Sequence, residues 1–271
     1  MSSSSPSPDL EPASVAPAAS RAADRLAFSL WIPAAVAATV CLAVGLVLEA
    51  RDVGRWAVIA ATGSFVVYGV DRLRDLRRDR DPSPRRTEFI ERNVIGFRVA
   101  LGLAAIGLVA AAAGASHEAL ALCATLGALG LLHRRLKRVP AIKSLYVSTA
   151  WTGICVGLPW LDTPDGSSAP GLWAVAILFP AFWSNLVASN LRDDEAALDP
   201  TPALHLARAA AAAAVILALF TPAPLRVLAW VPAAELLALL RFRTTEHYGH
   251  LAIDGALAAG ALLALGQHFA T

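Results

Sequence analysis

Charged residues and cysteines are scarce in this sequence. Asp, Glu, Lys and Arg make up 16% of its 271 residues, whereas 56% are hydrophobic and the mean hydropathy is +0.56. Soluble domains usually contain about 45–50% apolar residues. The three cysteines, Cys41, Cys123 and Cys155, all lie in apolar stretches, so they indicate neither a disulfide framework nor a metal site. This composition favours an integral membrane protein and leaves little chain for a soluble domain.

The start of the chain lacks the basic segment and the cleavage site of a signal peptide. Its content of Ser, Pro and Ala predicts a disordered tail over residues 1–24. We expect residues 25–271 to form a single transmembrane domain. The first apolar run, Leu26 to Ala50, is long enough to span a bilayer, because a membrane helix needs about 20 mostly apolar residues.

Nine apolar stretches predict an all-α, polytopic bundle of about nine transmembrane helices. Proline and glycine mark several of the connections between them. The predicted spans are Leu26–Leu48, Trp56–Val70, Val94–Ala113, Ala119–Leu132, Ser144–Leu161, Gly171–Ala188, Leu204–Phe220, Val227–Leu240 and Leu251–Phe269.

The basic residues favour this count and give an orientation. With nine spans and a cytoplasmic N-terminus, eighteen Lys and Arg residues fall on the inner segments and three on the outer ones. Such a bias is the usual signal of membrane orientation. We therefore expect a multi-pass protein of the plasma (inner) membrane, with its C-terminus outside.

Three aspartates at helical spacing follow the second apolar stretch. Asp71, Asp75 and Asp79 stand at i, i+4 and i+8, which would place their carboxylates on one face of a helix. Like charges stacked in this way repel, and Mg²⁺, which prefers hard oxygen ligands, would relieve the repulsion. The alternative is a solvated helix end whose acids pair with the four arginines between them.

A second acidic cluster follows the sixth apolar stretch. It comprises Asn190, Arg192, Asp193, Asp194 and Glu195, and is also cytoplasmic in the nine-span arrangement. Mg²⁺ is typically held by one or two carboxylates together with waters and substrate phosphates. Two facing sets of carboxylates are therefore suited to holding a diphosphate through bridging metal ions.

Both lysines of the chain lie in the basic loop after the fourth stretch. Lys137, Arg138 and Lys143 are candidates for contact with the remaining diphosphate oxygens. The alternative is that the basic residues of this loop contact no substrate, and only determine the membrane orientation and attract anionic lipids.

Two further features concern the membrane interior. Asp254 lies one turn beyond His250 near the start of the last span, and an ionisable residue at membrane depth is a functional candidate. Pairing with His250 at the interface is the alternative. Most of the tryptophans lie near span ends, as in interfacial belts, whereas Trp151 and Trp183 lie deeper and are candidates to line a cavity.

In these features the chain resembles the UbiA-type membrane prenyltransferases. Nine helices in a chain of this length match the family, and Asp71-x-x-x-Asp75 is similar to its first motif, Asn-x-x-x-Asp-x-x-x-Asp. Asn190-Leu191-Arg192-Asp193 is similar to the second motif, Asp-x-x-Asp-x-x-x-Asp. The stretch from Leu136 to Trp151 resembles the basic loop that leads into the fifth helix.

The resemblance implies a helical bundle around a central cavity that opens to lipid. It implies that Mg²⁺, held by Asp71, Asp75, Asp193, Asp194 and Glu195, binds the diphosphate of an isoprenyl donor, with Asp71, Asp75 and Asp193 as catalytic residues. An allylic cation would then be captured by an aromatic or other lipophilic acceptor. Substrate contacts are expected from Asn190, Arg192, Lys137, Arg138 and Lys143. Membrane lipid is an expected partner and nucleic acid is not.

The chain departs from the family motifs at three positions. Val67 stands where the first motif has Asn, Asn190 stands where the second motif begins with an acid, and Ala197 replaces its last acid. Altered metal use, a divergent acceptor or lost activity are therefore alternatives. So are a transporter, a partner-docking membrane protein and a related membrane terpene cyclase.

Overall fold

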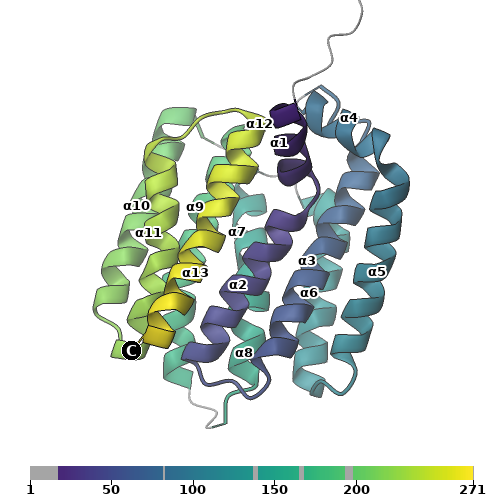
Figure 1. Ribbon diagram of the computed structural model, residues 1–271. Helices are drawn as coiled ribbons and strands as arrows, with labels where there is room; N and C mark the ends of the chain where they lie inside the picture. Colours follow the sequence, from purple (N-terminus) through teal and green to yellow (C-terminus); the bar gives the residue numbers. More distant parts are fainter. Residues whose placement is uncertain (1–17, 82, 137–139, 165–167, 193–197, 271) are drawn as a thin grey trace, which may run out of the picture.

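The structure is a computed structural model that describes residues 18–81, 83–136, 140–164, 168–192 and 198–270. Over these residues the chain forms helices and no strands, as the composition predicted. Figure 1 shows the long helices standing side by side along a common direction. Helices α1, α4 and α12 lie at one end, which we name the α4 end. Helix α8 and the C-terminal helix end lie at the other, the α8 end.

The first part of the chain supplies eight helices and a π-helical turn, η1, between α7 and α8. They are α1 (Ala18–Phe28), α2 (Trp31–Val47), α3 (Val53–Asp75), α4 (Pro84–Arg92), α5 (Val94–Ala112), α6 (His117–Leu136), α7 (Pro140–Thr152), η1 (Gly153–Gly157) and α8 (Leu158–Leu161).

The second part begins with the longest helix of the described chain and contains two further irregular segments, a 3₁₀ segment (η2) and a π-helical turn (η3). Its elements are α9 (Ser168–Arg192), α10 (Pro200–Leu219), η2 (Ala223–Ala229), α11 (Trp230–Leu240), α12 (Glu246–Tyr248), η3 (Gly249–Asp254) and α13 (Gly255–Ala270).

Six helical segments of the described chain are long and apolar enough to cross a membrane. They are Val53–Asp75, Val94–Ala112, Ser168–Arg192, Pro200–Leu219, Ala223–Leu240 and Gly249–Ala270. A seventh is added if Ala22–Phe28 and Trp31–Val47, bent by 55°, form one span. The two remaining predicted spans are Ala119–Leu132, which lies in α6, and Ser144–Leu161, which lies in the continuous segment formed by α7, η1 and α8. Neither segment is among the six.

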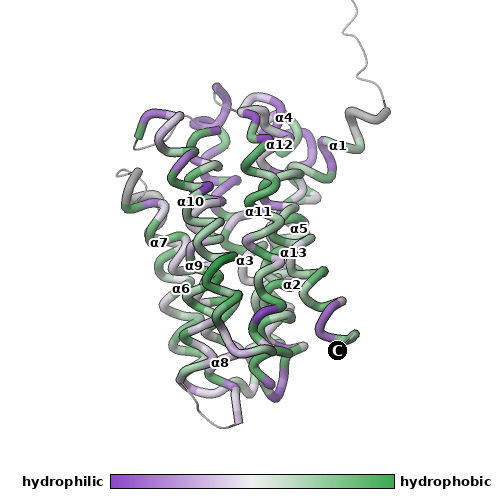
Figure 2. The backbone as a smooth tube through the Cα atoms, turned by 90° about the vertical axis from the view of Figure 1, so that its left-hand side faces the viewer, coloured by the Kyte–Doolittle hydropathy of each residue, from purple (hydrophilic) through white to green (hydrophobic). Residues whose placement is uncertain are grey.

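Helix α5 presents an apolar face to the outside of the bundle. Only 6% of its apolar window is buried, and Ile95, Ile106 and Val109 are each at least 68% exposed. In Figure 2 hydrophobic residues follow the helices through the middle of the bundle, and hydrophilic residues gather at its ends. Water-soluble monomers rarely expose large contiguous apolar patches. This surface is compatible with a multi-pass membrane protein.

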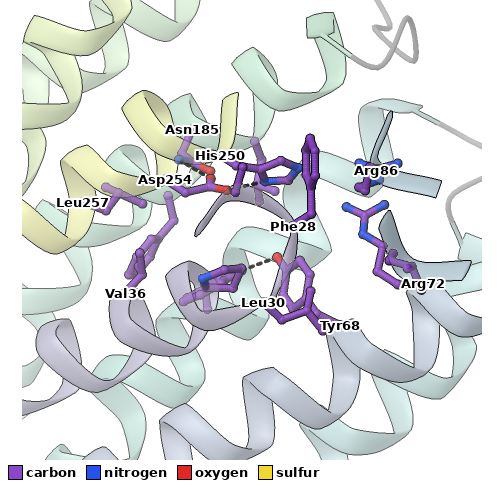
Figure 3. Close-up of a pocket in the computed structure, with 16 residues that line it drawn as sticks. Phe28, Leu30, Val36, Tyr68, Arg72, Arg86, Asn185, His250, Asp254 and Leu257 are labelled. Carbon is purple, nitrogen blue, oxygen red and sulfur yellow. Dashed lines mark hydrogen bonds and ion pairs between the residues drawn. The ribbon is translucent and has the colours of Figure 1, made fainter. Parts of the chain in front are cut away.

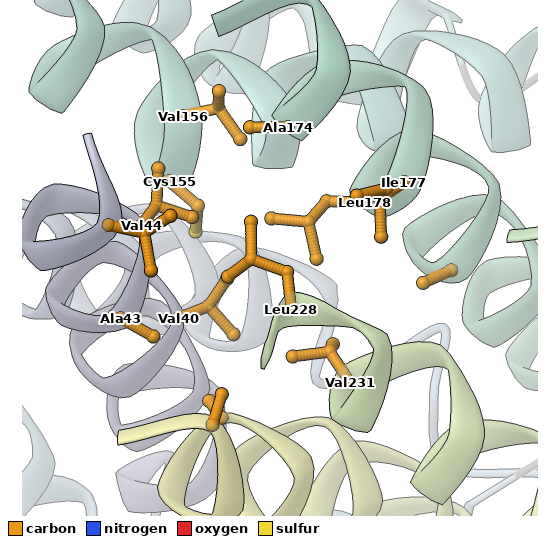
Figure 4. Packing of buried hydrophobic residues seen from close by; sticks show 14 of the residues in the cluster. Val40, Ala43, Val44, Cys155, Val156, Ala174, Ile177, Leu178, Leu228 and Val231 are labelled. Carbon is orange, nitrogen blue, oxygen red and sulfur yellow. The ribbon is translucent and has the colours of Figure 1, made fainter. Parts of the chain in front are cut away.

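The largest buried cluster joins helices from both parts of the chain. Val40 and Val44 of α2 meet Cys155 of η1, Leu178 of α9 and Leu228 of η2, and all of them have no exposed surface. Figure 4 shows these side chains converging between the helices. Close packing of this kind, together with interhelical polar contacts, holds membrane helices together.

Small residues allow two close helix approaches. Helix α10 buries Ala207, Ala211 and Ala218 on one face, and it packs along α9. On α13, a Cβ atom at Gly260 would overlap the carbonyl oxygen of Trp230 and lie 2.6 Å from Cα of Val231. Glycine is therefore required at this crossing of α13 and α11.

Helix α1 begins inside the segment for which the sequence predicted a disordered tail. Residues 18–24 are helical, and Asp24 contacts Nε2 of His247 at 2.7 Å and the guanidinium of Arg85 at 3.3 Å. These two contacts attach α1 to α12 and α4. The turn into α2 places Leu30 in the left-handed region, at φ 68°.

Candidate functional site

A pocket of about 440 Å³ lies among α3, α6, α7, α9 and η3. Pockets that bind small molecules usually range from about 300 to 1,000 Å³. Asp71 and Asp75 of α3, Lys143 of α7, and Asn190 and Arg192 of α9 all line it. These are the five predicted site residues that fall on the described chain. The other five, Lys137, Arg138, Asp193, Asp194 and Glu195, lie outside it.

The pocket has a charged part and an apolar part. The charged part lies where α3 and α9 end, and the apolar walls include Ile59, Leu108, Cys123, Leu126 and Ile154. A pocket divided in this way is complementary to an amphiphile with a polar head and a hydrocarbon chain.

The three aspartates at helical spacing do not all lie on a helix. Helix α3 ends at Asp75, and Asp79 lies in the turn that follows, although its backbone N–H still donates to the Asp75 carbonyl at 2.9 Å. The prediction of three carboxylates on one helical face is therefore wrong for Asp79. The backbone continues in a helix-like turn, however, and all three aspartates line the pocket.

Asp79, the third of these aspartates, forms two ion pairs. Oδ2 of Asp79 accepts from Arg72 at 3.1 Å and from Arg86 at 2.9 Å. The Arg86 side chain is 5% exposed. Pairing between acids and arginines, the alternative reading of this cluster, thus applies to Asp79. Arg86 of α4 was not a candidate in the sequence, because nothing there indicates that α4 folds back onto α3.

Asn190 presents an oxygen without a hydrogen-bond donor. Its Nδ2 donates to Oγ of Ser144 at 2.8 Å, and its buried Oδ1 accepts nothing from the described residues. The residue is 3% exposed. An unsatisfied buried carbonyl is costly, so a ligand that meets this oxygen would remove the cost.

Arg192 is positioned by a glycine of η3. A Cβ atom at Gly249 would overlap Nη1 of Arg192 and lie 2.6 Å from its Cδ. The guanidinium therefore occupies the space that a side chain at Gly249 would fill. In this position Arg192 lines the pocket beside His250.

Aromatic rings form part of the pocket wall. Nε1 of Trp151 donates to Oη of Tyr68 at 3.0 Å, and the Trp151 ring lies 5.7 Å from that of Phe182. Of the two tryptophans predicted as candidates to line a cavity, Trp151 lines this pocket, whereas Trp183 is not among its lining residues.

Val67 occupies the position of the missing motif asparagine and also lines the pocket. It is 36% exposed, and it lies against α6, where a Cβ atom at Gly130 would come within 2.9 Å of its Cγ1. Position 67 therefore lies at the pocket surface, and it holds a hydrocarbon side chain where the resembling motif has a polar one.

A second, smaller cavity of about 40 Å³ shares several of these residues. Figure 3 shows His250, Asp254 and Asn185 grouped on one side of it, with Arg72 and Arg86 on the other. Phe28 of α1 also lines this cavity and is 2% exposed. The side of α1 that faces the bundle thus covers the polar residues of η3.

The donor set suits Mg²⁺ only in part. Asp71, Asp75 and Asn190 offer oxygen ligands around one pocket, and these are the ligands that Mg²⁺ prefers. Within the described part of the chain, however, no three His, Cys, Asp or Glu side chains are grouped so that they could hold a metal ion. A metal ion held by these three residues would need further oxygen ligands.

Comparisons of the chain with models of protein families, with curated proteins and with solved structures found no match.

Proposed function

We propose that this chain is an integral membrane prenyltransferase, a divergent relative of the UbiA-type enzymes. It transfers an isoprenyl group from an isoprenyl diphosphate to an aromatic or other lipophilic acceptor, with Mg²⁺. The observation that carries the proposal is the common pocket of Asp71, Asp75, Lys143, Asn190 and Arg192, whose far walls are apolar.

The charged part of the pocket supports binding of a diphosphate. Arg192 and Lys143 are cations in the wall that can donate to phosphate oxygens, Arg192 with bidentate geometry. Asp71, Asp75 and Asn190 are the described residues that would hold Mg²⁺, which when bound neutralises charge on the leaving diphosphate.

The apolar part supports binding of the isoprenyl chain. Ile59, Leu108 and Leu126 provide walls from three helices, so the hydrocarbon is kept from water. Exclusion of water protects an allylic cation from hydrolysis. The faces of Tyr68 and Trp151 stabilise a nearby cation through their ring electrons.

The element order supports nine spans. The passes of the proposed arrangement are α2, α3, α5, α6, α7 with η1 and α8, α9, α10, η2 with α11, and η3 with α13, in the order in which these elements follow one another in the described chain. An odd number of passes places the first and last helices' outer ends on opposite sides of the membrane. In Figure 1, α1 and the end of α13 lie at opposite ends of the bundle. We propose that the α4 end is cytoplasmic in a plasma (inner) membrane.

The proposal is tested with protein purified in detergent, Mg²⁺, a panel of acceptors and geranyl, farnesyl or geranylgeranyl diphosphate. We expect Mg²⁺-dependent release of pyrophosphate with at least one donor. Asp71→Ala should reduce the release about 10²-fold or more, because a ligand of the Mg²⁺ that neutralises the leaving diphosphate is lost.

Asp81→Ala is the matched control, because Asp81 is exposed in the same segment and does not line the pocket. It should release pyrophosphate at the wild-type rate. The proposal fails if no donor yields metal-dependent pyrophosphate, or if Asp71→Ala behaves like Asp81→Ala.

A further inference from the structure

A histidine and an aspartate of η3 form a hydrogen-bonded pair in the pocket wall. Nδ1 of His250 lies 3.2 Å from Oδ2 of Asp254, and Nδ2 of Asn185 donates to Oδ1 of Asp254 at 3.2 Å. All three residues line the pocket. Figure 3 shows the chain of contacts from Asn185 through Asp254 to His250. Both carboxylate oxygens of Asp254 are thus used to hold a neighbour.

A buried carboxyl group lies behind this pair. Glu235 of α11 has no exposed surface, and neither of its oxygens has a hydrogen-bond partner within the described residues. Asn185 and Asp254 lie near it. An ionised carboxylate without a partner would be very costly in such a place. Asp254, in contrast, has both of its carboxyl oxygens in contact with a neighbour.

The pairing fixes which nitrogen of His250 faces a substrate. A carboxylate can only accept hydrogen bonds, so as a carboxylate Asp254 takes the hydrogen of Nδ1 of His250, and the neutral ring then keeps its lone pair on Nε2. His250 is 7% exposed and lines the pocket, and Nε2 is the ring nitrogen that Asp254 leaves available for a bound molecule. This is the arrangement of a general base that is oriented by a carboxylate.

We propose that His250 accepts the proton that the acceptor loses, with Asp254 and Asn185 as its positioning residues. The inference rests on the proposed function. An allylic cation from the isoprenyl diphosphate bonds to a carbon or oxygen of the acceptor, which then carries an extra proton. The electrons of that C–H or O–H bond return to the acceptor, and the proton moves to Nε2. His250 becomes an imidazolium beside the Asp254 carboxylate.

The surroundings of His250 include other charges. Arg192 of α9 and Arg72 of α3 act on the ring electrostatically from two neighbouring helices. Phe28 of α1 packs edge-on to it, with ring centres 6.1 Å apart. Both arginines also line the pocket in which the diphosphate is proposed to bind.

The first test needs no acceptor and no turnover. Protein labelled with ¹⁵N-histidine is studied by NMR in detergent, and the His250 signal is identified by its loss in His250→Gln. We expect the neutral ring to carry its hydrogen on Nδ1, and Asp254→Asn to abolish this preference. The control variant His205→Gln, on the exposed face of α10, should leave the signal unchanged. A neutral ring with its hydrogen on Nε2 would overturn the proposal.

The second test uses the donor and phenolic acceptors of the enzymatic assay. It compares the amount of prenyl alcohol, formed when water captures the cation, with the amount of prenylated product. His250→Gln should raise the ratio of alcohol to product about 10²-fold, because the proton acceptor is lost. Asp254→Asn should raise the ratio less. Asp71→Ala, in contrast, should lower both compounds together.

The outcomes separate the two proposals. Absence of pyrophosphate release from the wild type contradicts the prenyltransferase function, whereas the NMR result still decides whether His250 has a free basic nitrogen. Release with an unchanged ratio in His250→Gln overturns the role of the histidine and leaves the function intact.

Discussion

At the scale of the residue, Val67 stands where the motif that Asp71 and Asp75 resemble has an asparagine. The side chain lies at the pocket surface, one helical turn before Asp71. A polar side chain at this position would face the same space as the aspartates.

Val67→Asn is therefore expected to strengthen Mg²⁺ binding, because an amide oxygen is added beside two carboxylates. The Mg²⁺ concentration for half-maximal pyrophosphate release should fall by about tenfold. Val58→Asn, at an exposed position of the same helix that does not line the pocket, is the control and should not shift it. An unchanged Mg²⁺ requirement in Val67→Asn would contradict a metal site formed by Asp71 and Asp75 on the face of α3 that carries Val67.

The contact between Gly249 and Arg192 gives a second prediction. In Gly249→Ala the new methyl group takes the place of the guanidinium, so Arg192 must leave its position in the pocket wall. Affinity for farnesyl diphosphate should fall about tenfold, because one charge-assisted contact is lost.

Calorimetric titration of the donor into the protein measures this change. Gly255→Ala, in the next turn, is the control, since a Cβ atom there meets nothing within 4 Å. Equal affinities of the two variants would mean that Arg192 does not contact the donor.

At the scale of the element, the bundle depends on the close crossing of α13 and α11. Gly260→Ala places a methyl group against the backbone of Trp230 and Val231, which cannot move as a flexible side chain does. The helices must separate, at a cost of about 1–3 kcal/mol. We expect a lower Tm in detergent, by about 2–4 °C for each kcal/mol.

Gly266→Ala on the same helix is the appropriate comparison, because a Cβ atom at Gly266 has open space around it. Its Tm should equal that of the wild type or rise slightly, since alanine favours helix more than glycine does. A Tm of Gly260→Ala that matches that of Gly266→Ala would contradict the close crossing.

The element scale also shows what the sequence could predict. Hydropathy located the long helices to within a few residues, because burial in lipid requires continuous apolar runs. It could not place Arg86 against Asp79, since that contact depends on how α4 folds back. Asn190, Arg192 and Asp71 were predicted as neighbours from motif positions, whereas the pair of Gly249 and Arg192 has no signal in a single sequence.

At the scale of the whole molecule, the proposed orientation is open to a direct test. Arg77 lies near the α4 end and Ser116 in the turn between α5 and α6, and both are exposed. A membrane-impermeant thiol reagent applied to intact cells should label Ser116→Cys and spare Arg77→Cys. Permeabilised cells should show labelling of both.

Two of the natural cysteines, Cys41 and Cys155, are fully buried, whereas Cys123 is partly exposed in the pocket wall and sets the background labelling. The unsubstituted protein serves as the blank. The reverse pattern, with Arg77→Cys labelled from outside, would invert the membrane orientation and place the charged part of the pocket on the wrong side for a cytoplasmic donor.

The π-helical turn η3 has a consequence for how this chain tolerates insertions and deletions. Its hydrogen bonds run to the fifth residue, so the turn accommodates more chain than an α-helix of the same length. Removing one residue from Gly249–Asp254 would therefore restore an ordinary helix and leave Gly260 against Trp230. A one-residue deletion within α13 itself would instead rotate its two sides against each other by about 100°. The chain should thus tolerate a deletion in η3 better than a deletion in α13 as far as helix packing is concerned.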